Sequence, residues 1–307
     1  MTPSEPLLAN SEQCILGEGP IWDATRNRLL WVDIRRGIVF SGDLEPGGTV
    51  SITDAFECAQ TVGAVTVSTA GDMLIAGADA LLVRSANGNV EAGPSILPPG
   101  SGRRLNDGKV DPNGEFLVGT LSLEGESERE ILVRVGHDRA VELIDDDLTL
   151  SNGLGWSSDG SRFYSIDTLR QLVYVRSYSP TDTLGKRTEL IRISDGSPDG
   201  MCVDTEDHLW IAMWGQGEVR RYSPNGELVH TIAVPAPHVS CVCFAGPLLD
   251  TLVITTATQD LTEAQLNEFP LSGHLFTVEP GVRGLPQTPW SGFVTRSGSH
   301  GMLGDSE

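Results

Sequence analysis

The stretch LGEGPIWD, residues 16–23, places a carboxylate, Glu18, between two glycines and directly before a strand-like apolar run. Strands favour β-branched and aromatic residues, whereas glycine and acidic residues are depleted in them. Related stretches begin five more times along the chain, at intervals of 44, 44, 46, 47 and 41 residues. In order, the six copies are EGPIWD from position 18, VGAVTV from 62, NDGKVD from 106, NGLGWS from 152, DGMCVD from 199 and SCVCFA from 240.

Each copy is followed by further short apolar runs that are separated by turn sequences. After the first copy come NRLLWVDI at residues 27–34 and GIVFSGDL at residues 37–44. Asn-Gly and Asp-Gly pairs, as in DPNGE at 111–115 and SSDGS at 157–161, tolerate the positive φ angles of tight hairpins. Four short strands per unit of about 40–50 residues is the period of a β-propeller. We therefore predict an all-β, six-bladed propeller with four-stranded blades. A β-sandwich with coincidental spacing is the alternative, and it does not account for a register that holds six times.

The repeat also predicts how the chain is divided. We expect one propeller domain over residues 1–295 and a flexible C-terminal tail over residues 296–307. The segment EPLLANSEQC, residues 5–14, is expected to join the last blade, because an open ring would leave sheet edges unpaired. The one segment with a helical character is TEAQLNEFP, residues 262–270, which can form a helical turn.

Composition and charge limit the kinds of partner. The chain has 307 residues and a formal net charge of −21, which disfavours nucleic acids and anionic membranes as partners. Five cysteines without a CxxC pair favour a reducing compartment. The sequence shows neither a signal-peptide pattern nor an apolar run of membrane-spanning length. We predict a cytoplasmic protein that is a monomer or weak homo-oligomer.

The first position of the repeat contains the candidate metal-binding residues. In a propeller the first strand of each blade lines the central channel, so the residue before it faces the axis near one mouth. Four of the six residues at this position carry oxygen donors: Glu18, Asn106, Asn152 and Asp199. Two carboxylates facing each other across a narrow channel repel one another and lose solvation. A bound divalent cation relieves both effects, and a set of oxygen donors suits a hard cation such as Ca²⁺, Mg²⁺ or Mn²⁺. The alternative is that these residues only hydrate the channel or form turns.

With these residues identified, the sequence resembles the gluconolactonase/regucalcin family, the senescence marker protein-30-like sugar lactonases. The matching stretches extend from residue 16 to about residue 286, and they are LGEGPIWD (16–23), RLNDGKVDPNGEFLVGT (104–120), SNGLGWSSDGSRFYSIDT (151–168), SPDGMCVDTEDHLWIAMWG (197–215) and SGHLFTVEPGVRGLP (272–286). The resemblance implies a six-bladed propeller with one divalent metal (Ca, Zn, Mn or Mg) in the channel, held by Glu18, Asn152 and Asp199. It also implies substrate contacts from Arg104, Asn106 and Glu124, although the acidic loop 122–130 around Glu124 departs from the family pattern.

The reaction that the resemblance implies is metal-dependent hydrolysis of a sugar (aldono-1,4- or 1,5-) lactone to the aldonic acid. In that reaction Asp199 is expected to act as general base, and Arg104 and Asn106 to orient the ring. Arg104 can also stabilise the developing oxyanion. Trp214, just after its predicted strand, is expected to form a wall for the substrate.

Two other functions remain open at this point. One is a non-catalytic, calcium-binding protein like regucalcin, and the other is a paraoxonase-like hydrolase of esters or phosphotriesters. The chain has no GxSxG motif for a serine hydrolase, and its Gly-x-Gly pairs do not extend to a dinucleotide-binding motif. The sequence does not identify the sugar.

Overall fold

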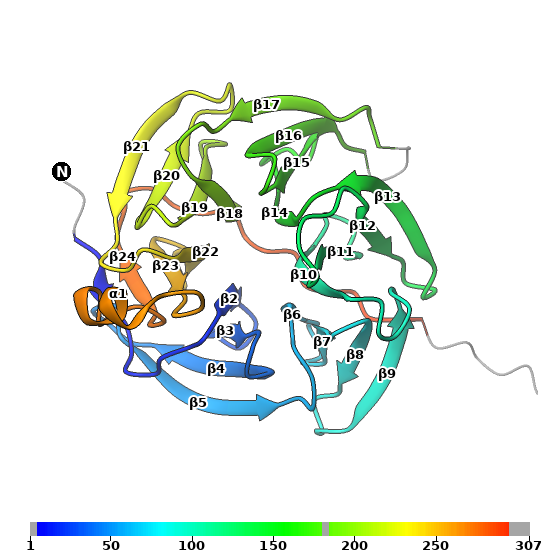
Figure 1. Ribbon diagram of the computed structural model, residues 1–307. Coiled ribbons are helices and arrows are strands. Elements are labelled where there is room, and N and C mark those ends of the chain that lie inside the picture. The colour runs from blue at the N-terminus through cyan, green and yellow to red at the C-terminus, as the bar shows by residue number, and fades with distance from the viewer. Residues whose placement is uncertain (1–4, 180–183, 295–307) are drawn as a thin grey trace, which may run out of the picture.

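The fold is a ring of six β-sheets around a central channel (Figure 1). The computed structural model describes residues 5–179 and 184–294. Each sheet has four strands, so the prediction of six four-stranded blades is confirmed. The predicted tail, residues 296–307, lies outside the described residues.

Five blades are built from consecutive strands that pair as antiparallel neighbours from the channel outward. Blade 1 contains β2 (Gly17–Asp23), β3 (Arg28–Asp33), β4 (Ile38–Leu44) and β5 (Val50–Glu57). Blade 2 contains β6 (Ala64–Val67), β7 (Met73–Ala76), β8 (Ala80–Arg84) and β9 (Val90–Ser95). Blade 3 contains β10 (Arg103–Val110), β11 (Phe116–Ser122), β12 (Glu130–Val135) and β13 (Val141–Leu148). Blade 4 contains β14 (Ser151–Trp156), β15 (Arg162–Asp167), β16 (Leu172–Ser177) and β17 (Thr188–Arg192). Blade 5 contains β18 (Ser197–Val203), β19 (Leu209–Trp214), β20 (Glu218–Tyr222) and β21 (Leu228–Ala233).

The sixth blade joins the two ends of the chain. It contains β22 (Val239–Ala245), β23 (Thr251–Thr256), β24 (Phe276–Val278) and, as its outer strand, the N-terminal β1 (Leu7–Leu8). Leu7 lies opposite Thr277 and Leu8 opposite Phe276 in an antiparallel pair. The ring is therefore closed by the N-terminal segment, as predicted, and the outer edge of β24 is covered.

Apolar side chains between neighbouring blades form the core. Trp31, Trp210 and Tyr164 are the largest fully buried side chains, and they lie in second strands of three different blades. The short helix α1 (Glu263–Glu268) forms where a helical turn was predicted, and Thr262 and Gln265 make a capping box at its start. No helix in residues 5–179 and 184–294 is long and apolar enough to cross a membrane. All five cysteines are free.

After β24 the chain crosses the channel axis. Gly284 donates its N–H to Leu249 O (2.8 Å) in blade 6, and Leu285 donates to Val203 O (3.3 Å) in blade 5. On the far side, Trp290 donates to Val67 O (3.0 Å) in blade 2. We call residues 284–290 the strap; in Figure 1 it is the orange-red segment that runs behind the inner strands. The strap covers the end of the channel where the first strands finish.

Candidate active site at the channel mouth

A β-bulge interrupts five of the six inner strands, and the predicted site residues lie at these bulges. The pairing with the second strand shifts between Glu18 and Ile21, Leu105 and Gly108, Asn152 and Leu154, Pro198 and Met201, and Val239 and Cys241. A bulge bends the strand and redirects a side chain that would otherwise follow the alternation of the sheet. The bulges therefore explain how polar side chains reach the channel from strands that are buried on both faces.

The glycines beside the acids let the inner strands approach one another. A Cβ atom added at Gly153 would lie 2.6 Å from the carbonyl oxygen of Asp199 in the next blade. One added at Gly200 would lie 2.6 Å from Cys241 Cβ in the blade after that. Any larger residue would push two inner strands apart. A glycine next to an acid or amide, first noted at Glu18, therefore permits both the bulge and the close approach of the inner strands around the channel.

Glu18, Asn152 and Asp199 are all buried at one end of the channel. Asn152 Nδ2 donates to Asp199 Oδ1 and to Thr168 Oγ1 (3.1 Å), and the Thr168 hydroxyl donates to the carbonyl of Pro198 (2.8 Å). With both amide hydrogens used, Asn152 Oδ1 is buried and has no hydrogen-bond partner among the described residues. A buried acceptor without a donor is costly, so this oxygen fits a cation as its partner.

The charges in this group destabilise one another. The pKa of Glu18 is raised to about 8, first because the carboxyl is buried and then because the Asp107 carboxylate is near. The pKa of Asp199 is raised well above its usual range by burial and by the charges of Glu18 and Asp107. A divalent cation would stabilise the ionised carboxylates, so the donor set and its electrostatics fit the predicted metal.

A metal site at this mouth requires the amide oxygen of Asn152. Within residues 5–179 and 184–294, no three His, Cys, Asp or Glu side chains are grouped so that they could hold a metal by themselves. The candidate set contains two carboxylates, Glu18 and Asp199, and one amide, Asn152, all of which are hard oxygen donors.

Arg104 and Asn106 lie beside the acids and are locked together. Arg104 Nη1 donates to Asn106 Oδ1 (2.8 Å) and to Leu105 O (2.9 Å), and Asn106 Nδ2 donates to Ser151 O (3.0 Å). Both side chains are buried. Burial lowers the pKa of Arg104 to about 10, and the charge of Glu18 opposes that shift. Because Asn106 Oδ1 accepts from Arg104, Asn106 orients the guanidinium, whose other N–H groups remain to bind a ligand.

Asp107 was not singled out from the sequence, although its charge acts on both predicted metal-binding acids. It lies within the bulge of β10, and its Oδ1 accepts from Gly108 N (2.8 Å). Burial raises the pKa of Asp107, and the Lys109 ammonium opposes the shift. Asp107 is the second polar residue of NDGKVD. A comparison of only the first residue of each repeat therefore does not identify Asp107.

Trp214 lies at the same mouth and stacks on a histidine. It pairs with Ser197 across β18 and β19, two residues before Asp199. Its ring lies 4.1 Å from that of His238, with 13° between the planes, and His238 Nδ1 lies 2.9 Å from Gln259 O. The half-buried position of Trp214 is compatible with the predicted wall for a substrate.

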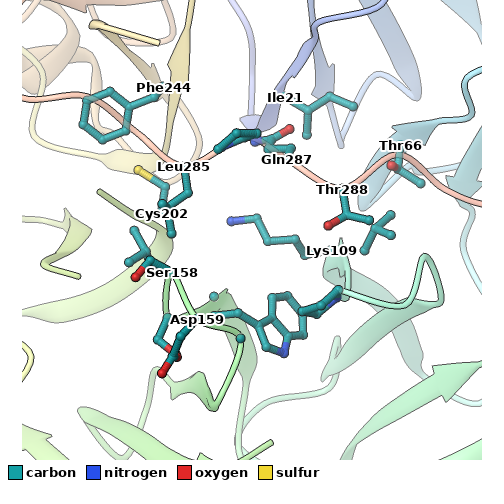
Figure 2. A pocket seen from close by; sticks show the side chains of 18 residues that line it. Ile21, Thr66, Lys109, Ser158, Asp159, Cys202, Phe244, Leu285, Gln287 and Thr288 are labelled. Atoms are coloured by element: carbon teal, nitrogen blue, oxygen red, sulfur yellow. The ribbon is translucent and has the colours of Figure 1, made fainter. Parts of the chain in front are cut away.

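The opposite end of the channel contains a separate cavity. It has a volume of about 340 Å³, and Ile21, Trp156 and Val203 from the ends of three inner strands are among its lining residues (Figure 2). None of Glu18, Asn152 and Asp199 is among the residues that line it. The cavity is thus distinct from the group of acids.

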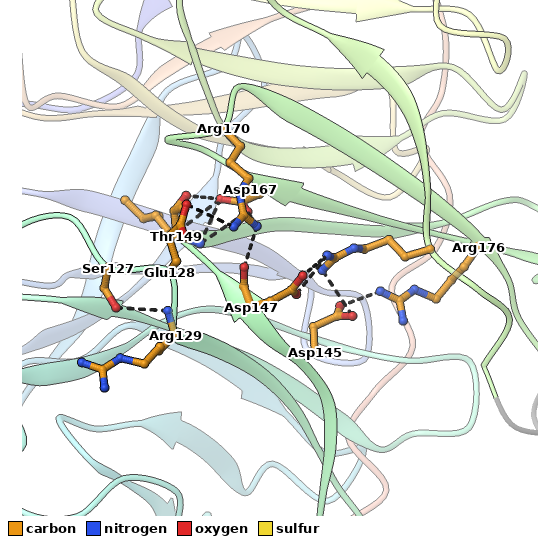
Figure 3. Close-up of polar contacts among 11 residues, drawn as sticks. Ser127, Glu128, Arg129, Asp145, Asp147, Thr149, Asp167, Arg170 and Arg176 are labelled. Atoms are coloured by element: carbon orange, nitrogen blue, oxygen red, sulfur yellow. Dashed lines mark hydrogen bonds and ion pairs between the residues drawn. The ribbon is translucent and has the colours of Figure 1, made fainter.

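Glu124 lies in a loop at the rim of the mouth and not in the buried group. It is exposed, and its carboxyl group folds over Gly102, two residues before Arg104, where an added Cβ would lie 2.6 Å from Oε1. The loop itself leans on blade 4: Glu128 forms an ion pair with Arg170 (3.7 Å), which also contacts Asp167 (3.1 Å) (Figure 3). The structure therefore brings together Glu18, Arg104, Asn106, Asn152 and Asp199, and it leaves Glu124 outside this group.

The fold and this buried group of acids, amides and one arginine define a propeller with a polar site at one channel mouth. Residues 16–258 match the family model described as "SMP-30/Gluconolactonase/LRE-like region". The chain therefore belongs to the SMP-30/gluconolactonase family, as its motifs indicated.

Curated relatives agree with this assignment. The chain is 31% identical to pentonolactonase XacC of Haloferax volcanii over 284 residues, which is 89% of this chain and 94% of that protein. It is 31% identical to regucalcin of Gallus gallus over 294 residues, which is 92% of this chain and 97% of that protein. A solved structure of regucalcin from Agrobacterium tumefaciens, a calcium-binding protein, superposes with a TM-score of 0.86 at 25% identity, covering 94% of this chain and 97% of that one. The expectation of an enzyme of the lactonase class is confirmed by the relatives that carry lactonase names.

Proposed function

We propose that this chain hydrolyses a sugar lactone to the corresponding aldonic acid with the help of one divalent cation. The observation that carries the proposal is the group formed by Asn152 Oδ1, which has no hydrogen-bond donor in the part of the chain that the structure describes, and the two buried carboxylates of Glu18 and Asp199. The names of two relatives, a pentonolactonase and a 6-deoxy-6-sulfogluconolactonase, support a sugar lactone as the substrate class.

Glu18, Asn152 and Asp199 are the residues that would hold the cation. When bound, the cation would supply Lewis-acid polarisation of the lactone carbonyl. Asn152 is oriented for this task because its two amide hydrogens are held by Asp199 and Thr168. That fixes the amide plane, and the amide oxygen accepts no hydrogen bond from residues 5–179 and 184–294. The relatives named regucalcin and the calcium-binding neighbour make Ca²⁺ the first ion to test.

Asp199 is the proposed general base. Its Oδ1 accepts from Asn152, so the second oxygen can accept a proton from an attacking water. Burial and nearby negative charge raise the pKa of Asp199 in the metal-free site, and a bound cation would keep this carboxylate ionised and so able to accept a proton.

Arg104 is the proposed anchor for the ring and the oxyanion. One of its terminal nitrogens is held by Asn106 Oδ1 and by its own strand, which fixes the guanidinium plane. Its remaining donors lie in a buried, water-poor site, where hydrogen bonds to developing negative charge are strongest. We assign Asn106 to the support of Arg104 and Trp214 to the wall of the substrate site. Glu124 could contact the substrate only from the exposed loop at the rim.

We also propose that the protein works in the cytoplasm, since five free thiols favour a reducing compartment. The single domain over residues 1–295 and the monomeric or weakly associated state remain predictions.

The test is release of acid from a panel of aldono-1,4- and 1,5-lactones. Protein treated with a chelator would be assayed alone and after addition of Ca²⁺, Mg²⁺, Mn²⁺ or Zn²⁺. We expect turnover of at least one lactone that disappears with chelator and returns with metal. Tight Ca²⁺ binding without turnover of any lactone would favour the second candidate, a calcium-binding protein without catalysis. Turnover of aryl esters or phosphotriesters alone would favour the paraoxonase-like alternative.

A further inference from the structure

The cavity at the strap end of the channel has a shape that is fixed by the fold. Its wall is formed where the inner strands end, and the strap covers it with Leu285, Pro286, Gln287 and Thr288. The strap is held on both sides, by the bonds of Gly284 and Leu285 to blades 6 and 5 and by that of Trp290 to blade 2. Gln287 Oε1 also accepts from Trp22 N (3.3 Å) in blade 1. With a volume of about 340 Å³, the cavity is in the range that small ligands occupy.

Lys109 places a positive charge at this cavity. Figure 2 shows its side chain extending into the middle of the ring of lining residues. The ammonium donates to Leu154 O (3.0 Å) and to Met201 O (2.8 Å), which belong to blades 4 and 5. An ammonium has three N–H donors, so one remains without an acceptor among the described residues. Lys109 is therefore a cation that is anchored to two neighbouring blades and keeps one N–H for a ligand.

Other free donors lie on the same wall. The hydroxyl groups of Thr66 and Thr288 and the side-chain amide nitrogen of Gln287 form no hydrogen bond within the described residues. Figure 2 shows Thr66, Gln287 and Thr288 on the side of the cavity where the strap passes.

The one carboxylate on the rim is already engaged. Asp159 accepts from the hydroxyl groups of Ser157 (2.6 Å) and Ser161 (2.7 Å), and these bonds hold its pKa at about 2. Asp159 is therefore ionised at neutral pH and does not offer a proton to a ligand. A ligand that bears its own negative charge has to bind toward Lys109, away from this rim.

The remaining wall is apolar. Ile21, Val110, Trp156, Phe244 and Leu285 surround the polar groups. Such a wall gains free energy by covering apolar surface, whereas Lys109 and the free donors need an acceptor, preferably a charged one. An apolar ring or short chain carrying a single carboxylate meets both needs.

We propose that this cavity is a binding site for a small monocarboxylate with an apolar body, whose carboxylate contacts the Lys109 ammonium. The site is separate from the proposed metal site at the other mouth, because none of Glu18, Asn152 and Asp199 lines the cavity. The proposal does not depend on the proposed lactonase function, and it makes the far end of the channel a place where a metabolite could influence the protein.

The test is calorimetric titration of benzoate into the full-length protein, with benzamide as a neutral ligand of the same shape. We expect one saturable site for benzoate and binding of benzamide that is at least tenfold weaker. Lys109→Met should weaken benzoate binding at least tenfold. The matched control is Lys186→Met, which removes the other lysine of the chain from an exposed position and should bind benzoate as the wild type does.

Thr288→Phe is a second variant that keeps the ammonium but fills the cavity from the strap, so it tests the site even if Lys109→Met does not fold. We expect it to abolish benzoate binding. No saturable binding to the wild type, equal binding of benzoate and benzamide, or unchanged binding by folded Thr288→Phe would each overturn the proposal and leave a cavity filled by water. Because the readout is binding to protein with or without metal, failure of this proposal leaves the lactonase proposal intact, and the reverse also holds.

Discussion

Single residues decide what the channel mouth can do, and Asp199 is the most informative of them. It is asked to bind the cation and to accept a proton. Asp199→Asn keeps an oxygen for the cation but removes the base, so we expect kcat to fall by roughly 10²–10⁴ when the metal site is fully occupied. Steady-state kinetics at saturating metal, with metal content measured in parallel, would check this. Asp146→Asn changes an exposed aspartate and should leave kcat unchanged. A metal-loaded Asp199→Asn variant with nearly normal kcat would move the base elsewhere, with Glu18 the next candidate.

A second prediction for a single residue concerns Arg104. Its guanidinium is fixed by Asn106 and Leu105, so removal deletes oriented donors and not just a charge. We expect Arg104→Met to lower kcat/KM by about 10²–10³, the effect of losing one oxyanion donor. Arg104→Lys should recover only a small part of this loss, because an ammonium cannot present the planar pair of donors.

The control for Arg104 is Arg192→Met, which removes an exposed arginine on the outer strand of blade 4 and should not alter the kinetics. The split between KM and kcat then assigns the role. A rise in KM alone means that Arg104 positions the ring, whereas a fall in kcat as well means that it stabilises the transition state. Kinetics equal to the wild type would remove Arg104 from the site.

At the scale of the element, the bulges in the inner strands direct the polar side chains of the site into the channel. Gly200 in β18 faces Cys241 of the next blade, and a Cβ there would lie 2.6 Å from Cys241 Cβ and 2.8 Å from its Cα. We expect Gly200→Ala to reduce the free energy of unfolding by about 1–3 kcal/mol, since the backbone must move to relieve the overlap. Because Asp199 is the preceding residue, activity should fall as well.

Denaturant unfolding and lactone turnover would measure both effects, with Gly155→Ala as the matched control. A Cβ at Gly155 would meet only side-chain atoms, at 3.0 Å from Val203 Cγ2 and 3.3 Å from Met201 Sδ, and these can shift. The loss of stability should therefore be smaller at Gly155. An equal loss for the two variants would show that the close approach of β18 and β22 does not require glycine.

The inner strands also show which features of the fold and the site could be predicted from the sequence. The number of blades, the ring closure by β1 and the convergence of four polar residues follow from a repeat that is visible in the chain, because blade symmetry maps one sequence position onto one place in the channel. The bulges break that mapping, since two residues of the inner strand oppose one of its neighbour. Asp107 therefore joins the acids although its register position was assigned to Asn106.

The observed strand boundaries differ from those that the repeat predicts, because contacts between strands also determine where a strand begins. β10 begins at Arg103, three residues before the predicted start, and β6 begins at Ala64, two residues after it. Arg103 donates to Glu130 (3.0 Å) and to Thr120 Oγ1 (3.0 Å), which extends the pairing of β10 toward the mouth. Such contacts involve residues in other strands of the blade, so they cannot be predicted from the repeat alone.

At the scale of the whole molecule, three of the six inner strands, β2, β10 and β18, bring the acids Glu18, Asp107 and Asp199 together, so the stability of the metal-free ring must depend on pH. The pKa of Glu18 in the folded, metal-free protein is about 8, against 4.5 for an ordinary glutamate in water. Below the ordinary value the carboxyl is protonated in both the folded and the unfolded state. Between the two values the folded state holds a proton that the unfolded state has released. The contribution of Glu18 to stability is therefore complete at low pH and is lost as pH rises through about 8.

A bound cation reverses this trend, because it replaces the proton as the partner of Glu18. We expect the increase in melting temperature caused by Ca²⁺, relative to chelator, to be larger at pH 8 than at pH 5. Thermal unfolding across this range, with and without Ca²⁺, would measure it, and Glu18→Gln should flatten both the pH dependence in chelator and the response to Ca²⁺. A Ca²⁺ response of the same size at pH 5 and pH 8, or one that Glu18→Gln retains in full, would contradict the assignment of Glu18 as a ligand. Such a result would place any bound cation away from the acids that the six-fold repeat brings together.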